Sequence, residues 1–189
     1  MKSYRQMFEE DYRPVREARE HGGFRTRYVY IGNWHVWDVP EERLKAIKRL
    51  MALSTALGTA IFLLGAWINS PLTWNRWVGL LTGLGLAAAL LEAVGVAQFC
   101  AARARLSRQY FNDINAKLNL APLARAMLMA GAAAASAVAL AGMSASFNDV
   151  LVPLCFLASA LCAVMTFRLY RSMPQRVLEN DANEGALEP

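Results

Sequence analysis

The sequence has little of what metal-dependent and redox enzymes use. Its 189 residues include three cysteines and two histidines, and no two cysteines form a C-x-x-C pair. Signatures of zinc proteases, serine hydrolases, P-loops and dinucleotide-binding folds are also missing. We therefore expect no catalytic residue, no metal site and no cofactor, and we interpret Cys100, Cys155 and Cys162 as small packing residues.

Charge is almost missing from four long apolar runs, at 50–68, 78–99, 126–145 and 150–167. Each run is close to the ~20 residues with which a helix crosses a bilayer. Glu92 is the one ionisable residue inside them, which is rare for core helices of a soluble protein. The third run is the weakest, because ten of its twenty residues are alanine, which inserts less readily than leucine.

The predicted fold class is all-α: a four-helix transmembrane bundle, made of two helical hairpins, over residues 47–172. Residues 1–46 are expected to form a small cytoplasmic amphipathic helix and β-hairpin, and residues 173–189 a largely disordered cytoplasmic tail. Residues 1–27 are charged throughout and lack the apolar core of a signal peptide, so the first span would be an uncleaved anchor.

Lys and Arg residues are concentrated on one side of these spans. Nineteen of the twenty lie in the N-terminal segment, the 100–125 stretch or the C-terminal segment, and Arg76 alone lies in an opposite loop. Because positively charged loops stay in the cytoplasm, we expect a multi-pass inner-membrane protein with both termini cytoplasmic. The net charge of +5 then reflects topology and contact with the lipid bilayer, not nucleic-acid binding.

Aromatic residues occur where membrane interfaces would hold them. They are Tyr28, Tyr30, Trp34 and Trp37 ahead of the first span, and Trp67, Trp74 and Trp77 where the first two spans meet the outer surface. The first group would dock the N-terminal segment on lipid or on the bundle, and the sequence leaves both open. An aromatic ligand box with His35 as its polar contact is the alternative.

Local patterns predict the elements around the spans. An apolar stripe predicts a helix over 3–20, and Gly32-Asn33 predicts a turn that pairs the residues on its two sides as a hairpin. Pro40 lies in the first turn of a predicted helix over 39–69.

The cytoplasmic ends of the other helices are predicted from composition. The second spanning helix is expected to continue to about Tyr110, with a turn near 112–119 and Pro122 in the first turn of the third helix. The fourth helix is expected to reach about Leu178.

Small residues recur where the spans would pack against one another. They are Gly79, Gly83, Gly85 and Gly95 in the second run, and Gly131 and Ala135 in the third. Small side chains let helix backbones approach closely in lipid. The G-x-x-x-G pair Gly79 and Gly83 would serve either this bundle or a second copy of the chain.

Glu92 lies on the small-residue face of its helix, so its carboxyl should point into the bundle. We expect no Lys or Arg at its depth, because Arg125 and Arg168 are placed near the inner ends. A carboxyl buried without a cation favours its protonated form, so Glu92 would often donate a hydrogen bond. The hydroxyl residues expected at similar depth are Thr55, Thr59, Ser136, Ser159 and Thr166.

The favoured function is that of a non-catalytic accessory or scaffold protein, which associates with itself or with other membrane proteins. The alternative is a small oligomeric transporter or channel that uses Glu92. Four spans with one membrane glutamate resemble the small multidrug-resistance transporters. In those proteins the glutamate lies in the first helix and the chain is little more than the bundle, so this chain is not assigned to that family.

Overall fold

The computed structural model describes residues 10–18, 24–144 and 146–179. The chain divides into two compact units. The helix unit comprises Val39–Ala102 and Ile114–Met173, and the strand unit comprises Met1–Asp38, Arg103–Asp113 and Pro174–Pro189. Most of the tail that we predicted to be disordered, from residue 180 onward, lies outside the described residues.

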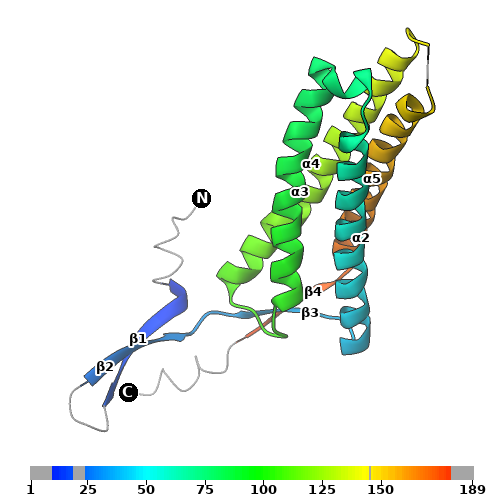
Figure 1. Ribbon diagram of the computed structural model, residues 1–189. Helices are drawn as coiled ribbons and strands as arrows, with labels where there is room; N and C mark the ends of the chain where they lie inside the picture. The colour runs from blue at the N-terminus through cyan, green and yellow to red at the C-terminus, as the bar shows by residue number, and fades with distance from the viewer. Residues whose placement is uncertain (1–9, 19–23, 145, 180–189) are drawn as a thin grey trace. The chain divides into compact units, whose positions relative to one another are not determined.

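Four long helices dominate the structure: α2 (Glu41–Trp67), α3 (Arg76–Ala101), α4 (Arg108–Leu140) and α5 (Phe147–Arg171). Within the helix unit they lie side by side, and the short 3-10 helix η1 (Pro71–Trp74) joins α2 to α3 (Figure 1). All four are long and apolar enough to cross a membrane. The four predicted helices are confirmed, and they fit a multi-pass membrane protein.

Local capping sets where these helices begin. Helix α2 starts directly after Pro40, with two glutamates in the first turn, where the helix dipole favours negative charge. Asn75 caps α3 by accepting a hydrogen bond from the Trp77 backbone N–H at 3.0 Å. Ser146 and Asp149 form a reciprocal capping box at the start of α5.

The connection between α3 and α4 lies earlier than we predicted. Helix α3 ends at Ala101, not near Tyr110, and α4 begins at Arg108, so that Pro122 lies inside the helix. The predicted turn at 112–119 is helical because it carries part of a buried apolar stripe. The residues of this stripe, each at most 4% exposed, are Phe111, Ile114, Leu118 and Ala121.

The other ends of α4 and α5 also differ from prediction. Helix α4 ends at Leu140, so residues 141–144 of the predicted third span lie outside it. Helix α5 ends at Arg171 and not near Leu178. Pro174 cannot continue a helix, and the residues after it form a strand.

Apolar side chains cover the helix unit outside as well as inside. Leu53 and Leu64 on α2 are 66% and 63% exposed, and Trp67, Trp74 and Trp77 are 89%, 84% and 70% exposed. A surface this apolar is typical of contact with lipid or with another protein. The buried cluster comprises Phe62, Leu72, Val78, Met129, Ala132, Ala133, Val152, Phe156 and Ala160.

The described residues of the strand unit form two antiparallel sheets of two strands each. Strand β1 (Tyr12–Ala18) pairs with β2 (Phe24–Tyr30), and β3 (Trp34–Trp37) pairs with β4 (Gln175–Leu178). The His35 backbone also exchanges hydrogen bonds with Leu106, at 2.9 and 3.0 Å. Segments far apart in the sequence therefore meet in this unit.

Two predictions for the N-terminal segment are wrong. The helix expected over 3–20 ends at Asp11: Glu10 and Asp11 are helical, Tyr12–Ala18 is a strand, and residues 3–9 and 19–20 lie outside the described ranges. Gly32-Asn33 does not pair β2 with β3, because the backbone N–H groups of Ile31 and Gly32 donate to the Asp11 carbonyl oxygen instead. Strand β3 takes its partner from the far end of the chain, and local periodicity carries no information about that partner.

Candidate functional site

Glu92 lies inside the helix unit, where its side chain is 0% exposed. The neighbouring buried residues on α3 include Ala88, Ala89 and Gly95, as the small-residue face predicted. Leu91 and Val94, on another face of the same helix, are 55% and 49% exposed. The carboxyl therefore points into the bundle rather than toward its apolar surface.

A cation pairs with Glu92, contrary to our prediction. Arg125 Nη1 lies 3.2 Å from Glu92 Oε2, and both side chains are 0% exposed. The expectation that no Lys or Arg reaches this depth is wrong. The reason we gave for a protonated Glu92 therefore no longer holds.

Arg125 lies deeper than predicted because the third long helix begins earlier than predicted. With Pro122 in a first turn, Arg125 would lie near a helix end, but it lies about halfway along the 33-residue α4. The sequence does contain a signal for this position. The buried stripe of Ile114 and Leu118 continues at helical spacing through Arg125 to Met129, which is also 0% exposed.

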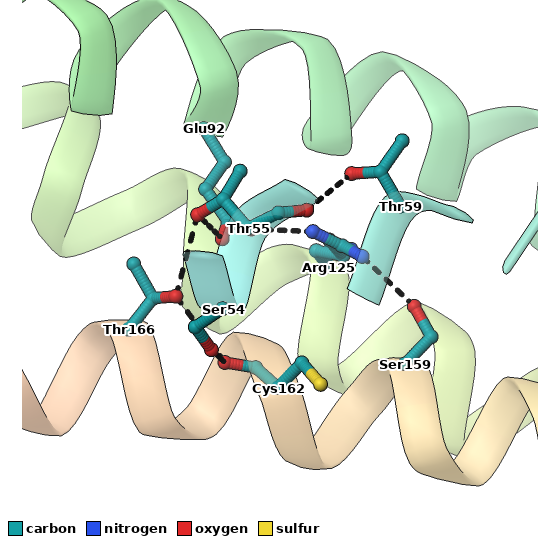
Figure 2. A network of polar contacts seen from close by, with 8 residues as sticks. All are labelled: Ser54, Thr55, Thr59, Glu92, Arg125, Ser159, Cys162 and Thr166. Carbon is teal, nitrogen blue, oxygen red and sulfur yellow. Dashed lines mark hydrogen bonds and ion pairs between the residues drawn. The ribbon is translucent and has the colours of Figure 1, made fainter. Parts of the chain in front are cut away.

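Hydroxyl groups from two further helices complete the network (Figure 2). The Thr55 hydroxyl on α2 donates to Glu92 Oε1 at 2.8 Å, and Arg125 Nη2 donates to Ser159 Oγ on α5 at 2.9 Å. Thr166 Oγ1 on α5 lies 3.4 Å from Thr55 Oγ1. All four long helices therefore contribute a side chain to one polar network.

Gly58 on α2 leaves the space that the Arg125 guanidinium needs. A Cβ atom at Gly58 would lie 2.8 Å from Arg125 Nη2 and 2.6 Å from Cys162 Cβ. Close by, the Ser54 hydroxyl donates to the Cys162 carbonyl oxygen at 2.9 Å (Figure 2). Close approach of α2 and α5 thus accompanies the ion pair.

Of the five hydroxyl residues predicted near Glu92, Thr55 alone bonds to it, and two lie outside the network. The Thr59 hydroxyl donates to the Thr55 carbonyl oxygen within α2, at 2.7 Å. Ser136 is 0% exposed, and its hydroxyl has no hydrogen-bond partner among the described residues. The structure gathers Thr55, Ser159 and Thr166 around the ion pair and leaves Thr59 and Ser136 outside it.

The predicted packing residues fall into two groups. Gly79 and Gly83 have nothing within 4 Å of a Cβ built on them, so the G-x-x-x-G motif makes no such contact within the described chain. At Gly95, by contrast, a Cβ would lie 3.0 Å from Lys117 Cβ. The four that face other side chains of the helix unit are Gly85, Gly95, Gly131 and Ala135.

Burial closes the network off from solvent. Glu92, Arg125, Ser159 and Thr166 are each 0% exposed, and Thr55 is 5% exposed. Two charges removed from water are tolerated only when they pair and when hydrogen bonds occupy their other polar atoms. The network meets most of this requirement, although Arg125 Nε has no partner among the described residues. Its chemistry suits a fixed link between helices.

The aromatic residues of the strand unit differ in exposure. Tyr28 is 57% exposed, whereas Trp37 is 5% exposed. The Tyr30 ring lies between Tyr12 and Trp34, with centroid distances of 5.2 and 4.7 Å. These contacts lie within the strand unit.

His35 stacks on Phe111, with ring centroids 4.7 Å apart. Burial lowers the pKa of His35 from its ordinary value, and the positive charge of Arg108 lowers it further, while Asp11 opposes the shift. Cys100 is exposed, and the described residues contain no group of three or more potential metal ligands from His, Cys, Asp and Glu.

Comparison with known proteins does not place the chain in a family. No protein-family model matches it, and no curated protein or solved structure matches it either. What the polar network does therefore has to follow from its own geometry.

Proposed function

We propose that this chain is a non-catalytic accessory or scaffold protein of a membrane, and that the Glu92–Arg125 pair holds its four helices in one arrangement. One observation carries the proposal: Glu92 and Arg125 pair with each other at 3.2 Å and are both 0% exposed. An ion-coupled transport site must exchange its partner with a proton or cation and must reach water. A sealed, internally neutralised pair supports a structural role instead.

The proposal includes a location and an orientation. The four apolar helices would cross the inner membrane, with both termini and the α3–α4 connection in the cytoplasm. The distribution of Lys and Arg supports this orientation, because Arg76 alone lies in a connection on the opposite side. The exposed Trp67, Trp74 and Trp77 would then lie at the outer interface.

Proton flux distinguishes the scaffold from a transporter that uses Glu92. Purified protein is reconstituted into liposomes with an internal pH dye, and a pH gradient is applied. We expect the same proton leak for the wild type, Glu92→Gln and an exposed control, Lys45→Gln. A leak that is present in the wild type and in Lys45→Gln but is lost in Glu92→Gln would contradict the scaffold proposal and favour the transporter.

A scaffold protein should associate with itself or with another membrane protein, and this association can be measured. Light scattering in mild detergent is expected to give a protein mass that is a multiple of the 20.9 kDa chain, or a defined complex with a second membrane protein. A strict monomer across the accessible concentration range, with no membrane protein bound after purification from native membranes, would contradict it.

A further inference from the structure

A polar cavity of about 430 Å³ lies within the strand unit. Pockets of this size hold small organic molecules. Its polar lining consists of Glu10, Asp11, Asn33, His35 and Arg108. None of these residues belongs to the buried network of the helix unit, so the cavity calls for its own explanation.

Asp11 is the unusual residue of this cavity. It is 7% exposed, and among the described residues its carboxylate has no hydrogen-bond or ion-pair partner. Its backbone carbonyl oxygen alone is engaged, by the N–H groups of Ile31 and Gly32. A carboxylate that lines a cavity without a cation bonded to it suits a ligand group that is positively charged and carries N–H donors.

Backbone packing holds the Asp11 carboxylate in position. A Cβ atom at Gly32 would lie 2.8 Å from Asp11 Oδ1 and 2.8 Å from the Tyr30 hydroxyl oxygen. The absence of a side chain at Gly32 therefore provides the room in which the carboxylate sits, beside the chain segment that lines the cavity.

Arg108 gives the same cavity a positive charge. Its backbone N–H donates to the Tyr30 hydroxyl at 2.9 Å, which fixes the first residue of α4 beside the cavity. Within the described residues its guanidinium forms no ion pair with Asp11, so the two charges are presented separately. A guanidinium binds phosphate and carboxylate through paired N–H donors.

We propose that this cavity binds a small zwitterion, whose amine pairs with the Asp11 carboxylate and whose phosphate or carboxylate pairs with the Arg108 guanidinium. His35 and Asn33 supply neutral polar contacts between the charges. The chemistry is shared by free phosphoethanolamine and by the ethanolamine headgroup of a membrane lipid.

Titration calorimetry with the full chain in mild detergent tests the site, with O-phosphoethanolamine as the probe. We expect saturable binding that is at least tenfold tighter than that of ethanolamine or of inorganic phosphate, because each of these keeps one of the two charged contacts. The proposal would be overturned if phosphoethanolamine bound no more tightly than ethanolamine or inorganic phosphate, or if its binding did not saturate.

Two variants assign the contacts, and Lys45→Gln in the helix unit is the control. Asp11→Asn and Arg108→Gln are each expected to weaken phosphoethanolamine binding about tenfold or more, with an unchanged circular dichroism spectrum. If Asp11→Asn fails to fold, Arg108→Gln tests the proposal by itself, because Arg108 is exposed and its replacement should not affect folding. Unchanged affinity in a folded variant of either residue would overturn the proposal.

Lipid competition identifies the source of the zwitterion. The titration is repeated in nanodiscs of phosphatidylglycerol with and without phosphatidylethanolamine. Weaker apparent binding of the free probe in the presence of phosphatidylethanolamine assigns the site to the lipid headgroup, and equal binding assigns it to a free zwitterion. Loss of binding in both nanodiscs would contradict the site.

Discussion

Taking a carboxylate and a guanidinium out of water costs several kcal/mol per ion, and their attraction repays this only when the geometry is good. Glu92 and Arg125 meet at 3.2 Å, and each has a further hydrogen bond to a hydroxyl, from Thr55 and to Ser159. Each residue is therefore tolerated because the other is present. The pair contributes a specific arrangement of helices more than a gain in stability.

Replacing one partner of the ion pair should therefore lower the free energy of unfolding more than replacing both. Glu92→Leu or Arg125→Met alone is expected to lower the free energy of unfolding by about 3–5 kcal/mol, because an unpaired charge stays buried. The double variant should lie within about 1 kcal/mol of the wild type or above it. Unfolding by SDS in mixed micelles measures all three. Additive effects of the two substitutions would show that the pair does not act as a unit.

His35 predicts how the strand unit responds to acid. Its pKa is lowered in the fold, first by burial and then by Arg108, so the unfolded chain binds the proton more readily. The contribution to stability is full above about pH 6.5, the ordinary histidine pKa, and is lost as the pH falls through the folded value. Unfolding followed by tryptophan fluorescence should show this loss in the wild type and less of it in His35→Gln. A wild type that gains stability on acidification would refute the assignment.

At the scale of helices and strands, the length of α4 decides which residues reach the level of Glu92. Because α4 begins at Arg108, the stripe through Ile114 and Leu118 continues into the bundle and carries Arg125 to the level of Glu92. A helix that began at Pro122 would leave Arg125 near its end. One boundary thus decides whether the helix unit contains an ion pair or a lone carboxyl.

Close helix approach gives a test with matched glycines. Gly58→Ala and Gly65→Ala place a methyl group 2.6–2.8 Å from atoms of α5 or α4 and should cost about 1–3 kcal/mol through overpacking. Gly79→Ala and Gly83→Ala meet nothing within 4 Å and should leave the unfolding free energy of the monomer unchanged or slightly raised. Both pairs are compared by SDS unfolding. Equal destabilisation by the two pairs would contradict the packing of α2 described above.

At the scale of the whole molecule, the surface of the helix unit differs from that of a soluble protein. Leucine and tryptophan lie on the surface, and the interior holds an ion pair and hydroxyl groups beside its apolar core. This is the distribution expected when hydrocarbon is the solvent and packing, not burial of apolar area, joins the helices. The strand unit, by contrast, carries exposed arginines and the polar cavity.

Cysteine labelling tests the proposed orientation. In a chain whose three native cysteines are replaced by serine, Ser144→Cys lies in the α4–α5 connection and Ser172→Cys lies just after α5. Both positions are exposed. A membrane-impermeant maleimide should label the first in intact cells and the second only after lysis. The opposite pattern would reverse the orientation, and labelling of both in intact cells would contradict a sealed membrane topology.

Prediction from the sequence worked where one residue's environment depends on its near neighbours. Pro40 with two glutamates marked the start of α2, and the small face of α3 indicated that Glu92 is buried. Prediction failed for the strands. Tyr12–Ala18 has helical spacing of apolar residues but forms a hairpin with the next strand, β2, and the residues after Pro174 pair with the distant β3.

The sequence by itself determined four apolar helices and a single carboxyl among them, because the length and composition of a run decide whether it suits hydrocarbon. The tertiary structure alone decided that Arg125 neutralises that carboxyl and that Asp11 faces a cavity with Arg108. Charge pairing depends on which segments meet in space and on where each helix begins. Backbone propensities are too weak to fix either one without the packing energy of the folded chain.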